Sequence, residues 1–175
     1  MDVNKIITKF DKFLVEQEYT FSGVVIGGAA LIIMDISLRA TKDIDFLDPE
    51  LEKEFLELAN TFREKYPKLN LQEDWINNGP ITLRRDLPFN WENRLVEIFK
   101  GEALILRTLG QADLLKSKLF AYCDRDIDLQ DCIDLSPSND ELDEALEWLT
   151  ERDGNPLWPE RVKAQIDYLK ERLNE

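Results

Sequence analysis

The chain carries Val24-Val25-Ile26-Gly27-Gly28 and, fifteen positions after Gly28, Asp43-Ile44-Asp45-Phe46. The apolar run before the two glycines predicts a buried strand that ends in a tight turn into a helix. In the second stretch acidic and apolar residues alternate, which predicts a strand with Asp43 and Asp45 on one face. Together the two stretches predict an α/β domain with a glycine turn and a pair of carboxylates as its candidate site.

This pair of carboxylates indicates a metal ion. Two adjacent carboxylates on one strand face repel each other unless a cation neutralises them, and Mg²⁺ commonly joins one or two carboxylates to substrate phosphates. A glycine turn at a helix start offers backbone N–H groups to such phosphates. The alternative is that Gly-Gly is only a turn and that Asp-x-Asp only ends a strand, since a motif without its structural context is a hypothesis.

The composition narrows the chemistry of any site. The 175 residues are 43% apolar and include four Trp, which is enough for a folded core with a helical extension. The absence of histidine excludes His-based nucleophile activation and His-containing zinc sites. A metal bound here should therefore be a hard ion held by carboxylates, which means Mg²⁺ or Mn²⁺.

The charge and hydropathy of the chain restrict its partners. A net charge of −14 argues against non-specific DNA binding, which depends on neutralising phosphates with Lys and Arg. The stretch from Arg84 to Arg125 is richer in basic residues and forms either a local basic wall or ordinary solvated surface. No apolar run reaches the roughly twenty residues of a membrane span, and no signal-peptide core follows Met1. With Cys123 and Cys132 expected as reduced thiols, we expect a cytoplasmic protein.

Periodicity along the chain predicts a small mixed sheet flanked by helices. An acidic helical extension then follows Gly110. We assign residues 1–110 to the α/β (α+β) core and residues 111–175 to an extension packed on it as one structural unit. The expected elements are a helix over 3–17, a strand over 21–26, a helix over 29–35, a strand over 44–47, a helix opened by Asp48-Pro49, a strand over 81–83, a hairpin over 94–106, and a helix begun by a capping box at Ser138.

Two-metal phosphoryl transfer needs about three acidic groups near one point, so a third carboxylate is required. Glu97 is the best candidate because it alternates with Val96 and Ile98 in a strand that could lie beside Asp43 and Asp45. The alternative is that Glu97 is a solvent-facing residue of an edge strand.

These motifs resemble the signature of the nucleotidyltransferase superfamily: a hydrophobic residue, Gly, Gly or Ser, a spacer, and an acid–hydrophobe–acid–hydrophobe run. The chain is more closely similar to the branch that contains the abortive-infection AbiEii-type toxins. That branch adds a Lys-Leu-x-Ala-x-x-x-Arg helix, matched by Lys118 to Arg125, and an Asp-x-x-Asp, matched by Asp128 to Asp131. The resemblance covers about residues 23–135.

The resemblance implies a minimal nucleotidyltransferase fold and Mg²⁺-dependent transfer of a nucleoside monophosphate from an NTP to an RNA or protein hydroxyl. It implies metal ligation and catalysis by three acids, Asp43, Asp45 and Glu97, and nucleotide contacts from Gly27, Gly28, Thr41, Lys42 and Lys118. Lys118 could instead be a surface lysine of its helix.

One departure from the family pattern concerns the third acid, which is usually Asp, whereas this chain offers Glu97. The alternative function is therefore a catalytically weak or inactive member of the superfamily that binds a nucleotide or a partner protein. Such a member, or an active one, could belong to a toxin–antitoxin or defence pair with a cognate partner protein.

Overall fold

A computed structural model describes residues 2–174, which form two compact units. One unit, the α/β unit, comprises the chain up to Arg85 together with Asn90–Leu109. The other, the helical unit, comprises Asp86–Phe89 and the chain from Gly110 onward. Among residues 2–174, none of the helices combines the length and the apolar character that crossing a membrane requires.

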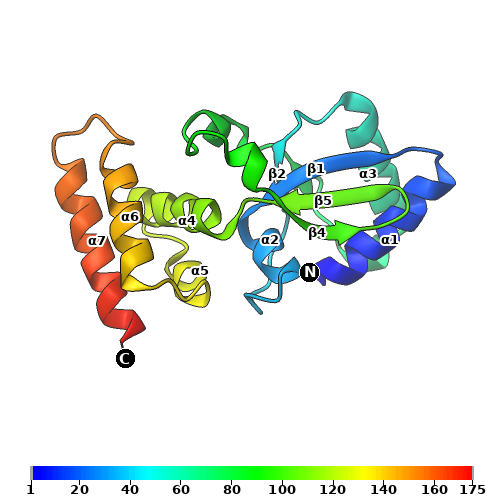
Figure 1. The fold of residues 1–175 in the computed structure, drawn as a ribbon. Coiled ribbons are helices and arrows are strands. Elements are labelled where there is room, and N and C mark those ends of the chain that lie inside the picture. Colours follow the sequence, from blue (N-terminus) through cyan, green and yellow to red (C-terminus); the bar gives the residue numbers. More distant parts are fainter. Residues whose placement is uncertain (1, 175) are drawn as a thin grey trace. The chain divides into compact units, whose positions relative to one another are not determined.

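The α/β unit is built on a mixed five-stranded sheet with the strand order β3-β2-β1-β5-β4. β1 pairs antiparallel with β2 and parallel with β5, while β2 pairs parallel with β3 and β4 pairs antiparallel with β5. The fold class predicted from the sequence is confirmed (Figure 1). The strands are β1 (Phe21–Ile26), β2 (Ile44–Asp48), β3 (Ile76–Asn77), β4 (Val96–Lys100) and β5 (Leu104–Thr108).

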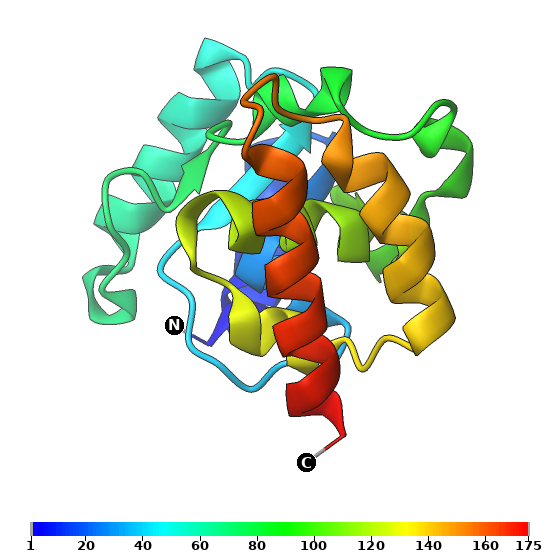
Figure 2. The ribbon, with the colours of Figure 1, turned by 90° about the vertical axis from the view of Figure 1, so that its left-hand side faces the viewer.

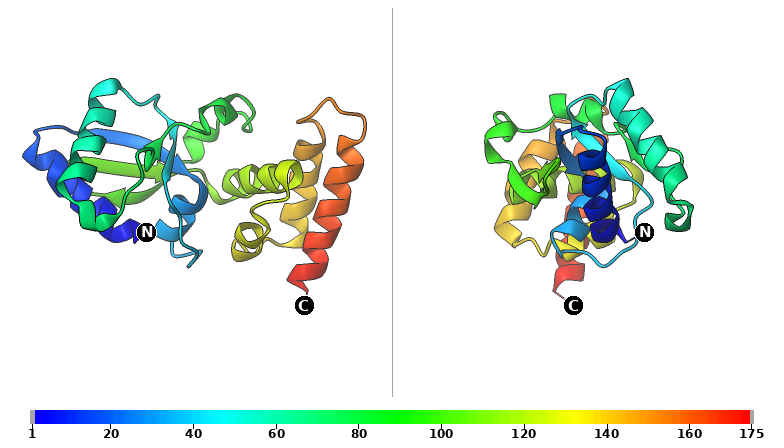
Figure 3. Two further views of the ribbon diagram at one scale, coloured as in Figure 1. Left: turned by 180° about the vertical axis from the view of Figure 1, so that it is seen from behind. Right: turned by 90° about the vertical axis from the view of Figure 1, so that its right-hand side faces the viewer.

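Three α-helices accompany this sheet: α1 (Val3–Glu16), α2 (Gly27–Ile33) and α3 (Lys53–Lys65). α1 and α3 lie side by side over one face of the sheet, as the left view of Figure 3 shows, and aromatic rings fill the space between them. Phe10 of α1 meets Phe55 and Phe62 of α3 and Trp75 edge-on, with ring centroids 5.0–5.8 Å apart. Aromatic pairs in this range add stabilisation beyond the area they bury, so this cluster fixes the helices on the sheet.

The expected hairpin is confirmed as β4 and β5. Its turn is held by a residue that is far away in the sequence. Asp11, a buried carboxylate on α1, accepts backbone hydrogen bonds from Glu102, Ala103 and Leu104 at 2.8–3.2 Å. Three donors to one carboxylate satisfy amides that would otherwise be buried without partners. The turn of the hairpin is therefore tied to the first helix of the chain.

Two expectations about the middle of the chain are wrong, and one strand was not predicted. Asp48 does not cap a helix: α3 begins at Lys53, and Asp48 ends β2 and forms an ion pair with Arg84. The stretch over 81–83 is not a strand but part of a 3₁₀ helix, η2 (Ile81–Arg85). β3 was not expected, because a strand of two residues is too short to show alternation. Two further 3₁₀ turns, η1 (Pro67–Leu69) and η3 (Trp91–Arg94), complete this unit.

The helical unit has its own apolar core. Its helices are α4 (Gln111–Arg125), α5 (Leu129–Asp134), α6 (Asn139–Thr150) and α7 (Trp158–Leu173). α6 and α7 run side by side, as Figure 2 shows, and Trp158 at the start of α7 donates from Nε1 to the Leu149 carbonyl at 2.7 Å. The predicted capping box is confirmed, because Ser138 and Glu141 bond reciprocally at the start of α6.

Candidate functional site

The strand pairing explains why the glycine turn and the aspartates belong together. β1 and β2 are antiparallel, and Ile26, the last residue of β1, is the register partner of Asp45 near the start of β2. Gly27 therefore follows directly beside Asp45. Between Gly27 and Asp43 the chain forms α2 and a return loop. These bring the start of β2 back to the end of the sheet where β1 stops.

Gly27 is required at this point for two reasons. Its φ is +78°, a left-handed conformation that side-chain-bearing residues rarely adopt. A Cβ built on Gly27 would also lie 2.8 Å from Oδ2 of Asp45, too close for any real contact. The Asp45 carboxylate thus rests directly against the backbone of the turn, in space that only glycine leaves open.

Asp43 and Thr41 form the second part of the same site. Asp43 directly precedes β2 and Asp45 lies on it, and both are half-buried while Ile44 and Phe46 are buried. Their placement on one face stays a prediction. The Thr41 hydroxyl lies 3.3 Å from Oδ1 of Asp43 and within hydrogen-bond distance of it. A Cβ on Gly28 would lie 3.4 Å from the Thr41 side chain, an ordinary contact.

The structure therefore brings five of the predicted residues to one place. They sit at the end of β1, the start of α2 and the start of β2: Gly27, Gly28, Thr41, Asp43 and Asp45. Lys42 lies between Thr41 and Asp43 in the chain and its side chain is exposed. Its predicted contact with nucleotide stays a prediction.

The donor set of this site fits a hard divalent cation. Its polar groups are two carboxylates and a hydroxyl, all of them oxygen donors of the kind that Mg²⁺ and Mn²⁺ prefer. Among residues 2–174 no group of three or more His, Cys, Asp or Glu side chains gathers as a metal cluster. The acidic contribution to the site thus comes from a pair of carboxylates rather than a triad.

Glu97 does not lie beside this pair, so the expected strand neighbourhood is wrong. β4 is the edge strand at the far side of the sheet from β3, and β1 and β5 separate it from β2. Three inter-strand spacings amount to about 14 Å, whereas ligands of one ion must all approach it within about 2.5 Å. Glu97 is exposed, and its register partner on β5 is Arg107. This matches the alternative of a solvent-facing residue on an edge strand.

Lys118 belongs to the helical unit and is not a surface lysine. Its side chain is 6% exposed, and its Nζ lies 2.6 Å from Oδ2 of Asp131 and 3.5 Å from Oδ2 of Asp128. The Asp131 side chain is 1% exposed. The Lys-Leu-x-Ala and Asp-x-x-Asp motifs therefore meet in a buried ion pair that joins α4 to α5. A phosphate contact by Lys118 stays a prediction.

One residue beside the site was absent from the sequence prediction. Asn77 on β3 is the register partner of Asp45 on β2, and it follows Ile76, which pairs with Ile44. The sequence offered no local signal for this, because β3 is two residues long and its pairing depends on the rest of the sheet. An asparagine before Asn78-Gly79-Pro80 is more typical of a turn.

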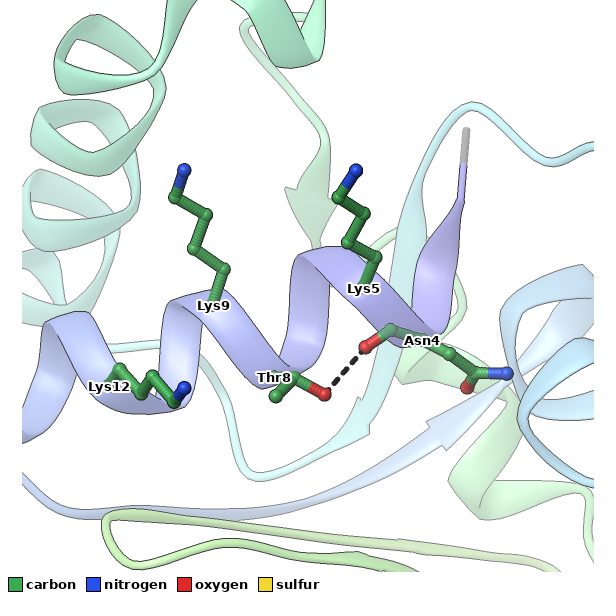
Figure 4. A pocket seen from close by; sticks show the side chains of 5 residues that line it. All are labelled: Asn4, Lys5, Thr8, Lys9 and Lys12. Carbon is green, nitrogen blue, oxygen red and sulfur yellow. Dashed lines mark hydrogen bonds between the residues drawn. The ribbon is translucent and has the colours of Figure 1, made fainter.

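A separate hollow of about 560 Å³ lies on α1 and contains none of the predicted site residues. It is lined by Asn4, Lys5, Thr8, Lys9 and Lys12. Figure 4 shows Lys5 and Lys9 pointing the same way from the helix and the Thr8 hydroxyl bonded to the Asn4 carbonyl. The Lys9 ammonium sits 3.8 Å from the centre of the Tyr66 ring. This is a basic patch on an acidic protein, and it is distinct from the aspartate site.

The comparison with protein families agrees with this geometry. The structure and the site define a small α/β protein with a glycine turn against an Asp-x-Asp strand. The chain belongs to the family described as "Nucleotidyltransferase of unknown function (DUF6036)", whose model matches residues 3–143. No curated protein and no solved structure matches the chain. The family match spans the α/β unit and reaches into α6.

Proposed function

We propose that this protein is a nucleotidyltransferase that uses Mg²⁺ or Mn²⁺ to transfer a nucleoside monophosphate from an NTP to a hydroxyl group. The observation that carries the proposal is the contact of the Asp45 carboxylate with the Gly27 turn, with Asp43 directly before β2 and bonded by the Thr41 hydroxyl. Membership of a family described as nucleotidyltransferases supports it.

In this proposal each residue of the site has its own role. Asp43 and Asp45 would hold the cation, and the Thr41 hydroxyl would orient Asp43. The cation, when bound, would neutralise charge on the triphosphate and on the leaving group. The Asp45 carboxylate fills the space beside Gly27, so a cation bound by Asp45 would stand next to the glycine turn. This chemistry is positioning and charge stabilisation, which a chain without histidine can supply.

A second function, nucleotide binding without catalysis, is favoured by one observation. Among residues 2–174 no group of three or more His, Cys, Asp or Glu side chains gathers, so the site offers only the Asp43/Asp45 pair. A pair suffices to bind a metal–nucleotide, but a metal pair that clamps both attacking and leaving oxygens calls for more acidic ligands. The fold alone does not decide between these functions.

The biological setting is proposed from the motifs alone. The matches at Lys118 to Arg125 and Asp128 to Asp131 support a place near the AbiEii-type toxins. On that proposal, the acceptor is an RNA or a protein, and the protein works within a toxin–antitoxin or defence pair with a cognate partner protein. The net charge of −14 favours a protein acceptor over long RNA.

The test incubates the protein with each α-labelled NTP, Mg²⁺ or Mn²⁺, and cell extract, beside an Asp43→Asn/Asp45→Asn variant. Asparagine keeps the side-chain volume and removes the charge, so a difference reports the carboxylates rather than a folding defect. We expect label in RNA or protein with the wild type alone. Nucleotide-dependent thermal stabilisation without label transfer would support the non-catalytic function. Neither label nor stabilisation with any NTP would refute both.

A further inference from the structure

The segment that follows Trp75 places Asn77 beside the aspartate pair. β3 runs parallel to β2, and the partners Ile44↔Ile76 and Asp45↔Asn77 share a register. Ile44 and Ile76 are both buried, while Asp45 and Asn77 are both half-buried. Since register partners on neighbouring strands point to the same side of the sheet, Asn77 stands on the face that carries Asp45.

Gly79 shows that the two side chains border one small space. A Cβ built on Gly79 would lie 2.9 Å from Oδ1 of Asn77 and 4.0 Å from Oδ1 of Asp45. The same oxygen of Asn77 accepts a 2.6 Å hydrogen bond from the Gly79 backbone N–H. An amide oxygen has two lone pairs, so one stays available after this bond.

The neighbouring Asn78 makes the hydrogen bonds that hold this segment against β2. Its Nδ2 donates to the carbonyls of Phe46 and Pro49 at 2.9 and 3.0 Å, and its Oδ1 accepts from the Leu51 N–H at 2.6 Å. All three partners lie in or just after β2. Asn78 thus ties the segment to β2. Asn77 donates from Nδ2 to the Asp74 carbonyl at 3.4 Å, and its Oδ1 borders the space at Gly79 that Asp45 also borders.

We propose that Asn77, rather than Glu97, is the third member of the Asp43/Asp45 site and contributes its neutral amide oxygen to the same cation. Side-chain amide oxygens are ordinary ligands of hard divalent ions. The charge at the site is then two negative groups and one neutral donor, which favours a single cation. This inference rests on the proposed function, because it assumes that Asp43 and Asp45 bind a metal.

The test measures Mn²⁺ binding by the full-length protein, using calorimetry and the EPR signal of free Mn²⁺. Three variants are compared with the wild type: Asn77→Asp, Asn77→Ala and Glu97→Gln. We expect Asn77→Asp to tighten Mn²⁺ binding by about tenfold, because ligand charge tunes such sites over orders of magnitude. Asn77→Ala should weaken binding by about threefold to tenfold, and Glu97→Gln should leave it unchanged.

The opposite signs of the two Asn77 variants keep the test independent of folding, since a folding defect cannot tighten metal binding. If Asp45→Asn abolishes Mn²⁺ binding while both Asn77 variants bind as the wild type does, the inference about Asn77 fails and the metal site stands. Loss of binding in Glu97→Gln would likewise overturn it. If the wild type binds no Mn²⁺, the metal-dependent function and this inference fail together.

Discussion

Replacing Gly27 by alanine tests whether the glycine turn is built around the Asp45 carboxylate. Gly27 has φ +78°, and the left-handed conformation costs a residue with a Cβ about 1–2 kcal/mol. The new Cβ would also stand 2.8 Å from Oδ2 of Asp45, so this carboxylate must move. We therefore expect the free energy of unfolding to fall by about 1–3 kcal/mol.

The neighbouring glycine provides a matched control. Gly28 has no positive φ, and its Cβ would be 3.4 Å from Thr41, an ordinary contact. Because Gly28 lies in α2, Gly28→Ala should be neutral or stabilising by up to about 1 kcal/mol. The substitution to alanine is thus expected to destabilise the protein at position 27 and not at position 28.

The assay is thermal and urea unfolding followed by circular dichroism. In a chain of this size 1 kcal/mol corresponds to about 2–4 °C in Tm, so Gly27→Ala should lower Tm by about 2–12 °C. Mn²⁺ should then raise the Tm of Gly27→Ala less than that of the wild type, because the displaced Asp45 binds metal more weakly. A Gly27→Ala variant that melts at or above the wild-type temperature would refute the argument.

The remaining predictions concern buried polar groups. Lys118→Met leaves the Asp131 carboxylate buried without its ammonium partner, so the free energy of unfolding in urea melts should fall by about 3–5 kcal/mol. A variant with normal stability that no longer binds nucleotide would instead indicate that Lys118 contacts phosphate. Asp11→Ala leaves three amides of the β4–β5 turn without their acceptor and should lower the free energy of unfolding by about 3 kcal/mol in the same assay. Asp11→Asn should give a value between those of the wild type and Asp11→Ala. Equal losses for the two variants would mean that the charge of Asp11 does not contribute to stability. Burial raises the pKa of the Cys123 thiol to about 12 and raises the pKa of Cys132 as well, so neither should react with a thiol reagent in the native protein at pH 8. Because the unfolded thiol has a pKa of about 8.5, the stabilisation from these groups is complete below that pH and is lost as the pH rises toward 12; urea melts at pH 8 and 10.5 should show the fall, and a smaller one for Cys123→Ala.

The parts of the site that the sequence could reveal are those with a local physical cause. Alternation of acidic and apolar residues predicted the strand that carries Asp45, because successive side chains of any strand point to opposite sides. The capping box at Ser138 needs only four consecutive residues, and it formed as predicted. The hairpin was predictable because its two strands and turn are contiguous in the chain.

Errors at the sequence level have a common origin in long-range pairing. Glu97 carries the right chemistry on a correctly predicted strand, yet that strand sits at the far edge of the sheet. Asn77 carries no recognisable signal, yet β3 brings it beside Asp45. Lys118 has the sequence context of an exposed helix residue, and only the packing of α5 against α4 buries it with Asp131.

The glycine turn, the aspartate pair and the absence of histidine follow from the chain read residue by residue, and they suffice to indicate a hard-metal, phosphate-directed site. Which third side chain stands at that site depends on strand order. Strand order is set by contacts between residues far apart in the chain, and these leave no periodic trace in either strand. The tertiary structure alone therefore places Asn77, rather than Glu97, on the strand beside Asp45.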